Sequence, residues 1–142
     1  MRDPDAITEI FRQRGLKVTP QRQSIFRILH RTSGHLTAES VHRQARVEMP
    51  TISLKTIYDT LHSLASLGEI QALDLGTGST LFDATVRPHH HLVCTSCRRT
   101  EDVDFEVAAL APADRHGFVI LNTDVVARGL CPDCAGRAGQ SD

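Results

Sequence analysis

Residues 81–104 read LFDATVRPHHHLVCTSCRRTEDVD, and this stretch holds the ligands expected of two chemically different metals. It contains an aspartate, three consecutive histidines, two cysteines separated by two residues, and a run of acidic residues. Thiolates select zinc, whereas imidazoles combined with carboxylates suit Fe(II), Mn(II) or Zn(II). We therefore interpret the stretch as a metal centre and consider the chain on either side in relation to it.

The cysteines form two CxxC pairs, Cys94 with Cys97 and Cys131 with Cys134. Two such pairs can close a tetrahedral four-thiolate zinc site that leaves no open position for chemistry. Thirty-three residues separate the pairs, more than the roughly 15–20 residues of an ordinary zinc ribbon, so we expect the ion to hold a whole subdomain together. Redox-active or simply buried cysteines are the alternative, which the match of both pairs disfavours.

The three histidines are expected to lie on a β-strand. Alternate residues of a strand share a face, so His89 and His91 should point one way and His90 the other. An imidazole pair joined by carboxylates suits Fe(II), Mn(II) or Zn(II), which makes His89 and His91 candidate ligands. On spacing alone, a histidine cluster could also be a surface feature that binds no metal.

The chain before the metal centre has the order of a winged helix-turn-helix domain. Apolar periodicity and N-capping residues predict four helices, at residues 5–14, 20–31, 38–48 and 53–67. Two alternating segments on either side of a glycine-rich turn then indicate a β-hairpin over residues 69–82. We place this DNA-binding domain at residues 1–83, with residues 53–67 as the helix that enters the major groove.

This interpretation nominates DNA contacts on and near the recognition helix. The candidates are Ser53 at its N-terminus, Lys55, Thr56 and Tyr58 on its exposed side, and Lys17 and Arg22 as phosphate contacts. A helix of this kind is also commonly plain core packing, and the hairpin after it is what favours the DNA-binding interpretation.

After a hinge at residues 84–88, we expect residues 89–142 to form a small α/β domain for metal binding and dimerisation. Strands are predicted at residues 91–93 and 100–103, a helix from about 106 to 116 that Pro112 could kink, and further strands at 117–121 and 123–127. The whole chain is thus predicted to be α+β.

Composition excludes several classes of protein. The chain has 142 residues, 40% of them hydrophobic, with a net charge of −1, so it is expected to be globular rather than disordered. Residues 1–82 carry ten basic and eight acidic residues, and residues 83–142 carry six and nine, which suits DNA binding by the first part and cation binding by the second. Without an apolar run or leader segment, we expect a cytoplasmic protein with no membrane partner.

Together these motifs resemble the Fur family of metal-dependent bacterial repressors over nearly the whole chain. The resemblance is carried by residues 16–22 (LKVTPQR), 34–39 (GHLTAE), 53–58 (SLKTIY), 89–97 (HHHLVCTSC) and 131–134 (CPDC). It implies a homodimer that binds operator DNA, with a winged-helix domain, an α/β dimerisation domain and a structural Zn(II) held by the four cysteines.

The resemblance also implies a second, regulatory metal. Its Fe(II) or Mn(II) ligands, carried over position by position, are His35, Asp83, His89, His91 and Asp102. With aspartate at position 102, the ligand set resembles that of the peroxide-sensing branch of the family. In that branch, bound Fe(II) reacts with hydrogen peroxide and a ligand histidine is oxidised. His35 and His89 are the expected oxidation-sensitive residues.

Three other functions remain open from the sequence. The nearest is an iron, manganese or zinc uptake regulator of the same family without peroxide chemistry. A hydrolytic enzyme would need an open position on its metal, and no substrate-cleft motif accompanies the ligands, so we expect no enzyme. A thiol redox module would need the CxxC cysteines to be free to cycle, which a zinc ion bound by all four would prevent.

Overall fold

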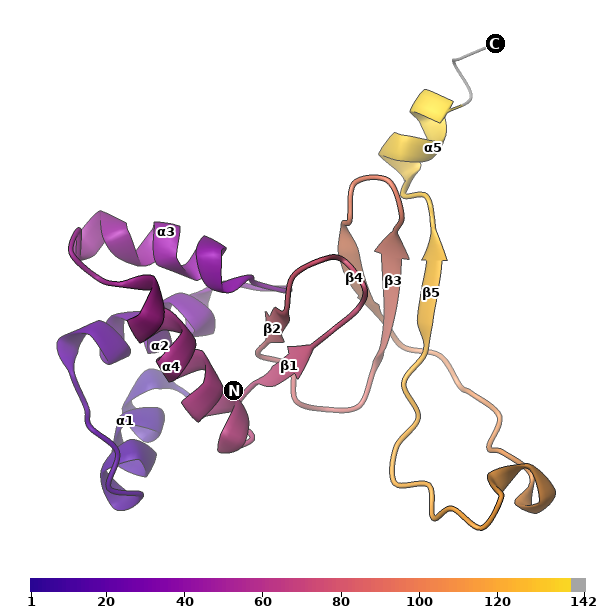
Figure 1. Cartoon of the computed structure of the whole chain (residues 1–142), viewed down its shortest axis with the longest axis horizontal. Coiled ribbons are helices and arrows are strands. Elements are labelled where there is room, and N and C mark those ends of the chain that lie inside the picture. The colour runs from indigo at the N-terminus through magenta and orange to yellow at the C-terminus, as the bar shows by residue number, and fades with distance from the viewer. Residues whose placement is uncertain (139–142) are drawn as a thin grey trace. The chain divides into compact units, whose positions relative to one another are not determined.

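A computed structural model describes residues 1–138 and shows a mixed helix and strand fold (Figure 1). The chain divides into two compact units, Met1–Val86 and Arg87–Asp142, which we call the N-terminal and C-terminal units. The division falls between Val86 and Arg87.

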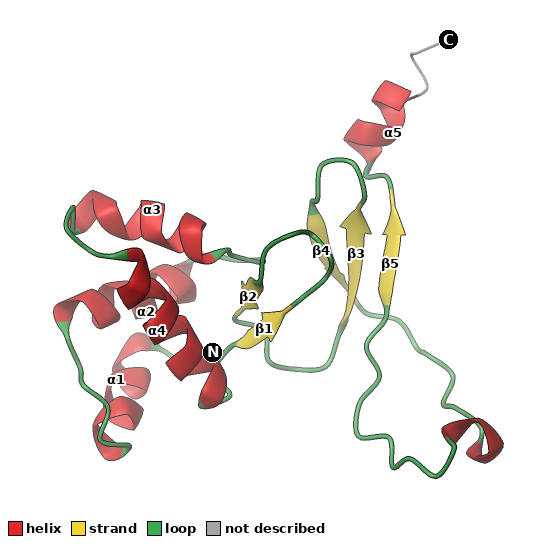
Figure 2. Cartoon of the chain, in the orientation of Figure 1, coloured by secondary structure: helices red, strands yellow, loops and turns green. Residues whose placement is uncertain are grey.

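The N-terminal unit begins with four helices, coloured red in Figure 2. They are α1 (Pro4–Gln13), α2 (Pro20–Arg31), α3 (Ala38–Glu48) and α4 (Leu54–Ser66). Each helix starts where an N-cap side chain accepts a backbone N–H that has no partner within the helix. The caps are Asp3, Thr19, Thr37 and Ser53 in chain order.

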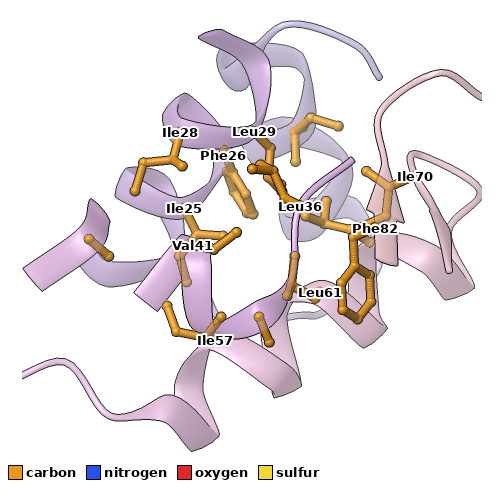
Figure 3. Packing of buried hydrophobic residues seen from close by; sticks show 14 of the residues in the cluster. Ile25, Phe26, Ile28, Leu29, Leu36, Val41, Ile57, Leu61, Ile70 and Phe82 are labelled. Atoms are coloured by element: carbon orange, nitrogen blue, oxygen red, sulfur yellow. The ribbon is translucent and has the colours of Figure 1, made fainter. Parts of the chain in front are cut away.

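The apolar faces of the four helices meet in a single hydrophobic cluster (Figure 3). Phe11 of α1 packs edge-on against Phe26 of α2, with ring centroids 4.8 Å apart. From α4, Ile57 and Leu61 are fully buried, as their spacing along the helix predicts. Phe82 extends the cluster to the hairpin that follows α4.

That hairpin is the predicted wing. Strand β1 (Gln71–Leu73) pairs antiparallel with β2 (Leu81–Asp83). Gly76 and Gly78 between them have positive φ angles of 69° and 89°, which suit glycine at a turn. Four helices followed by a hairpin is the order expected of a winged helix-turn-helix domain.

The C-terminal unit is built on a three-stranded sheet with the order β4-β3-β5. Strand β3 (His90–Cys94) pairs antiparallel with β4 (Thr100–Val103) and parallel with β5 (Val126–Gly129). The helix α5 (Pro132–Ala138), which was not predicted, follows β5.

The segment between β4 and β5 differs from the prediction. The helix expected at about 106–116 is wrong, since only the 3₁₀ turn η1 (Pro112–Arg115) forms there. Strand structure begins only at Val126. The prediction of a strand at 117–121 is therefore wrong, and the strand predicted at 123–127 starts three residues later than expected. Pro112 lacks the N–H that a helix interior requires and disfavours helical backbone at Ala111. His116, with φ of 46°, ends the turn.

No helix in residues 1–138 is long and apolar enough to cross a membrane. The longest of these helices, α4, has 13 residues, fewer than the roughly 20 that a bilayer requires.

Candidate metal centres and nucleic-acid interface

The sheet of the C-terminal unit brings the two CxxC pairs together. Cys94 ends β3, and the parallel pairing of β3 with β5 places Cys94 opposite Gly129. Cys131 follows β5 by two residues, and Cys134 lies in the first turn of α5. The 33 residues between the pairs therefore return to the same end of the sheet.

The four sulfur atoms have the geometry of one tetrahedral site. Each lies within 4.8 Å of the others, and the Sγ atoms of Cys97 and Cys131 are 3.7 Å apart. Zn–S bonds of about 2.3 Å place the sulfurs of a tetrahedral site roughly 3.8 Å apart. All four cysteines are free thiols rather than disulfides. The cluster thus fits a structural zinc ion, as predicted.

Backbone and side-chain donors around the cluster stabilise thiolates. The N–H groups of Cys97 and Cys131 lower the pKa of Cys94 to about 6. The Arg137 guanidinium, which donates to the Sγ of Cys134 at 3.2 Å, lowers the pKa of that thiol.

Cys97 behaves in the opposite way. The backbone N–H of Arg99 lowers the pKa of Cys97, but hydrogen bonding to the sulfurs of Cys94 and Cys131 outweighs it and raises the pKa to about 11. Four sulfurs this close cannot all ionise without a cation between them, which supports a metal rather than a redox role.

Two of the five predicted ligands of the regulatory metal belong to the N-terminal unit. Leu36 and Phe82 form an isolated antiparallel bridge, with N–O distances of 2.9 and 2.7 Å. Their neighbours His35 and Asp83 are consequently opposite each other, and His35 Nε2 lies 3.8 Å from Asp83 Oδ2. A ligand pair from positions 48 residues apart in sequence is thus assembled by the wing strand β2.

Local hydrogen bonds hold Asp83 in place. Its Oδ1 accepts the backbone N–H of Thr85 at 2.7 Å, an Asx turn. Gln71, which is paired with Asp83 in the hairpin, donates from its side chain to the carbonyl of Thr85 at 2.9 Å. These contacts leave Oδ2 as the Asp83 oxygen nearest to His35.

The C-terminal unit holds the other three predicted ligands on one face of its sheet. Strand alternation puts His89 and His91 on the same side, and their ring centroids are 4.6 Å apart. Asp102 is directly opposite His91 in the β3–β4 ladder, and its Oδ1 lies 3.4 Å from His89 Nε2. Two imidazoles and a carboxylate therefore converge, as Fe(II), Mn(II) and Zn(II) sites require.

His90 points to the other face and has a different role. Its Nδ1 accepts the backbone N–H of Val125 at 3.2 Å, so the proton lies on Nε2, which is 3.1 Å from the carbonyl oxygen of Phe105. The ring also stacks beside that of Phe105, with centroids 4.4 Å apart. His90 thereby joins the two ends of the segment that runs from β4 to β5.

Three of the predicted DNA contacts are exposed and three are half-buried: the exposed ones are Lys17, Ser53 and Lys55, and the half-buried ones are Arg22, Thr56 and Tyr58. Lys55 is exposed and its Nζ is 2.6 Å from Asp59 Oδ2, one turn further along α4. The Tyr58 hydroxyl donates to Glu39 Oε1 at 2.9 Å, which joins α4 to α3.

The remaining candidates lie at helix starts. Ser53 caps α4, and its Oγ lies 2.9 Å from the hydroxyl of Thr56. Arg22 donates to the backbone carbonyl of Lys17 at 2.7 Å, and its guanidinium lies over the Phe11 ring.

Sequence reasoning missed Gln71 and Thr85 beside Asp83, Arg137 beside Cys134, and the ion pair of Arg87 with Asp104. Signals existed for some of them. Asp-x-Thr at 83–85 is an Asx-turn pattern, and Arg87 and Asp104 are oppositely charged residues at the ends of the ligand-bearing hairpin. Glu39, in contrast, is joined to Tyr58 only by the packing of two helices.

Comparison with known proteins agrees with this geometry. Residues 13–126 match the model of the ferric uptake regulator family. The peroxide-responsive repressor PerR of Staphylococcus aureus is 32% identical over 131 residues, which cover 89% of this chain and 87% of that protein. PerR of Staphylococcus saprophyticus is 32% identical over 139 residues, covering 94% and 91%.

Solved structures show the same fold. The ferric uptake regulator of Helicobacter pylori, described with three functional metal-binding sites, superposes with a TM-score of 0.76 at 18% identity, covering 92% of this chain and 90% of that one. PerR of Streptococcus pyogenes, studied for peroxide sensing and gene regulation, gives a TM-score of 0.55 at 25% identity, covering 94% of both chains. The chain belongs to the ferric uptake regulator family of metal-dependent transcriptional repressors.

Proposed function

We propose that the chain is a homodimeric repressor that binds operator DNA when one Fe(II) or Mn(II) ion is held by His35, Asp83, His89, His91 and Asp102. The observation that carries the proposal is the division of these ligands between the two compact units. Each unit by itself brings an imidazole close to a carboxylate. Three imidazoles and two carboxylates suit both metals.

A ligand set shared by two units is a physical route to regulation. Coordination by both units restricts the angle between the DNA-binding unit and the unit that carries the sheet. We propose that the arrangement which completes the ligand set is also the one in which the two recognition helices of a dimer enter successive major grooves, so that metal occupancy favours operator binding.

We further propose that peroxide inactivates the repressor by oxidation of His35 or His89. Fe(II) held by these residues would supply the electrons that cleave the O–O bond of peroxide; overall, one peroxide oxygen would be added to the imidazole and the other would leave as water. An imidazole that has gained oxygen is a poorer donor, so the ligand set is no longer complete and the operator is released. The 32% identity to two peroxide-responsive repressors supports this function over metal uptake control.

The proposed DNA interface comprises Ser53, Lys55, Thr56 and Tyr58 on α4, with Lys17 and Arg22 at the start of α2. Lys55 should contact phosphates, so Lys55→Ala should weaken binding about equally for all duplexes. The slope of log affinity against log salt concentration should become shallower by about one. Fluorescence anisotropy over a series of salt concentrations measures both quantities. An unchanged slope would remove Lys55 from the interface.

The test of the function uses protein that retains its zinc and is loaded without oxygen with either Fe(II) or Mn(II). A DNA duplex selected from a random pool by the Mn(II) form serves as operator. After a small excess of peroxide, we expect one added oxygen on His35 or His89 in the Fe(II) form, together with loss of operator binding. The Mn(II) form should retain both its mass and its operator binding.

Two controls sharpen this experiment. His42 lies in the same tryptic peptide as His35, residues 32–43, and should remain unmodified because it is outside the proposed ligand set. His89→Ala should abolish metal-dependent DNA binding while one zinc per chain is retained. If both metal forms still bind the operator after peroxide treatment and neither gains an oxygen on a histidine, the result would instead support an iron, manganese or zinc uptake regulator.

A further inference from the structure

An ion pair closes the open end of the hairpin that carries three of the proposed ligands. Both terminal nitrogens of Arg87 donate to Asp104, Nη1 to Oδ1 at 2.8 Å and Nη2 to Oδ2 at 2.9 Å. A two-bonded contact of this kind fixes the orientation of both groups, which a single contact between long side chains does not.

The register of the sheet places this pair beside the ligands. The β3–β4 ladder pairs His91 with Asp102 and His90 with Val103. If the ladder is extended by one residue, His89 is opposite Asp104. The ladder ends at the pair of His90 with Val103, so His89 and Asp104 are the next residues beyond it on the two sides. The guanidinium of Arg87, two residues before His89, donates to Asp104.

The backbone of Arg87 acts directly on His89. The carbonyl oxygen of Arg87 lies 2.8 Å from His89 Nδ1. A carbonyl can only accept, so Nδ1 carries the proton and Nε2 offers its lone pair. This Nε2 atom is the one that lies 3.4 Å from Asp102 Oδ1. The carbonyl thus selects the tautomer in which His89 can bind a metal through Nε2.

We infer that Arg87 and Asp104 are positioning residues for the regulatory metal: their ion pair holds the Arg87 carbonyl against His89 and keeps His89 Nε2 beside Asp102. The inference rests on the proposed function, since it assigns supporting residues to the proposed ligands. It adds two residues that never touch the metal but determine the orientation of one that does.

The alternative role for the pair is to keep Asp104 itself from acting as a ligand. Both carboxylate oxygens accept from Arg87, and this hydrogen bonding, with the positive charge, holds the pKa of Asp104 below its ordinary value. If Arg87 kept Asp104 away from the metal, removal of Arg87 would free an additional oxygen ligand and strengthen metal binding. That effect is the opposite of the weaker binding expected when a positioning residue is removed.

The experiment measures Mn(II) affinity by titration of the zinc-loaded, full-length protein. Arg87→Gln and Asp104→Asn should each weaken Mn(II) binding by about tenfold, the lower end for residues that support a metal ligand. The double variant should lose no more than either single variant, because the two side chains act as one unit. Stronger binding by Arg87→Gln, or losses that simply add, would overturn the inference.

A second readout reports on the histidine without the metal. The imidazole ¹⁵N spectrum is recorded on protein that has zinc on its cysteines and no regulatory metal. It should show His89 protonated on Nδ1 in the wild type and a mixture of tautomers in Arg87→Gln. An ion pair that only adds stability would leave this spectrum unchanged, and an unchanged spectrum would therefore count against positioning.

The same strand offers a matched control. Glu101 lies on β4 on the opposite face from Asp102 and pairs with Arg99, whose Nε is 2.6 Å from Glu101 Oε1. Its side chain is 53% exposed, compared with 63% for Asp104. Glu101→Gln should leave Mn(II) affinity unchanged, and an equal loss there would overturn the inference. If the zinc-loaded wild-type protein binds no Mn(II), the proposed function fails and the inference fails with it. If the wild type binds Mn(II) and the substitutions Arg87→Gln and Asp104→Asn do not alter its affinity, the inference alone is rejected.

Discussion

The two units of the chain bury apolar side chains to very different extents. All sixteen residues of the hydrophobic cluster belong to the N-terminal unit. Among the described residues of the C-terminal unit, the buried hydrophobic positions are Val93 and the cysteines Cys94 and Cys134. Phe118, Val119 and Leu121 of that unit are instead 73%, 84% and 93% exposed.

This difference shows that the units are stabilised by different means. The N-terminal unit has an ordinary core of interlocking helix faces, whose burial is the main favourable term in folding. The C-terminal unit has little such core, so a metal that links its strands must contribute much of its folding free energy. Its exposed apolar segment is in addition suited to cover by a second copy of the chain.

The largest expected effect comes from removing a zinc ligand. Cys131→Ser should abolish zinc binding and unfold the C-terminal unit, because a structural zinc site contributes on the order of 10 kcal/mol or more. The N-terminal unit should remain folded. Zinc analysis and residue-specific hydrogen exchange measure the two parts of this prediction.

The control for that substitution is Asp133→Asn, inside the same CxxC pair and 76% exposed. It should retain one zinc per chain and normal exchange. If Cys131→Ser also unfolded the N-terminal unit, the two units would not be stabilised independently of each other.

A smaller effect is expected from a cavity in the N-terminal core. Leu61 is fully buried between the helices, so Leu61→Ala should lower the free energy of unfolding of that unit by about 2–5 kcal/mol. Zinc content should not change. Denaturant unfolding followed by circular dichroism gives the loss, and the 83% exposed Val47 provides a control, Val47→Ala, which should stay within about 0.5 kcal/mol of wild type.

The exposed apolar segment predicts an effect on assembly rather than on folding. Leu121→Ser should weaken the proposed homodimer, by about 1.5–3 kcal/mol for each leucine that the dimer buries. Sedimentation equilibrium measures the dissociation constant. The same dissociation constant in the variant and the wild type would show that this segment is not covered by a partner.

The smallest effect lies at the contact between Tyr58 and Glu39. The backbone N–H of Glu39 and the hydroxyl of Tyr58 lower the pKa of Glu39, and the same bond raises the pKa of Tyr58. Because the folded pKa of Glu39 is lowered, its contribution is complete above the ordinary glutamate pKa and is lost as pH falls through the folded value. The contribution of Tyr58 is complete below its ordinary pKa and is lost in alkali.

Tyr58→Phe should therefore destabilise the N-terminal unit by at most about 1 kcal/mol near neutral pH, since the pair is largely exposed. The difference from wild type should vanish in acid. Thermal unfolding at several pH values measures it, and a difference that persists at the lowest pH would show that the lost hydroxyl, rather than the hydrogen bond to a carboxylate, is responsible.

Much of the N-terminal unit was predictable because its signals are local. Caps such as Thr19 and Ser53, and apolar residues at helical spacing such as Ile57 and Leu61, depend on neighbours three or four residues away. The zinc cysteines were equally clear, since the CxxC spacing is itself the chemical requirement for two thiolates on one ion.

Sequence alone thus determined the four helices of the N-terminal unit, the hairpin that follows them, the histidine strand and the cysteine cluster. The segment between β4 and β5 was decided by tertiary structure, because a helix or strand needs a surface on which to bury its apolar face, and among residues 87–138 the large apolar side chains of this segment from Phe105 to Leu121 are exposed. The contact of His35 with Asp83 and that of Arg87 with Asp104 also required the fold. Each depends on the pairing of backbone segments that are distant in sequence, and the register of that pairing is set by packing over the whole unit.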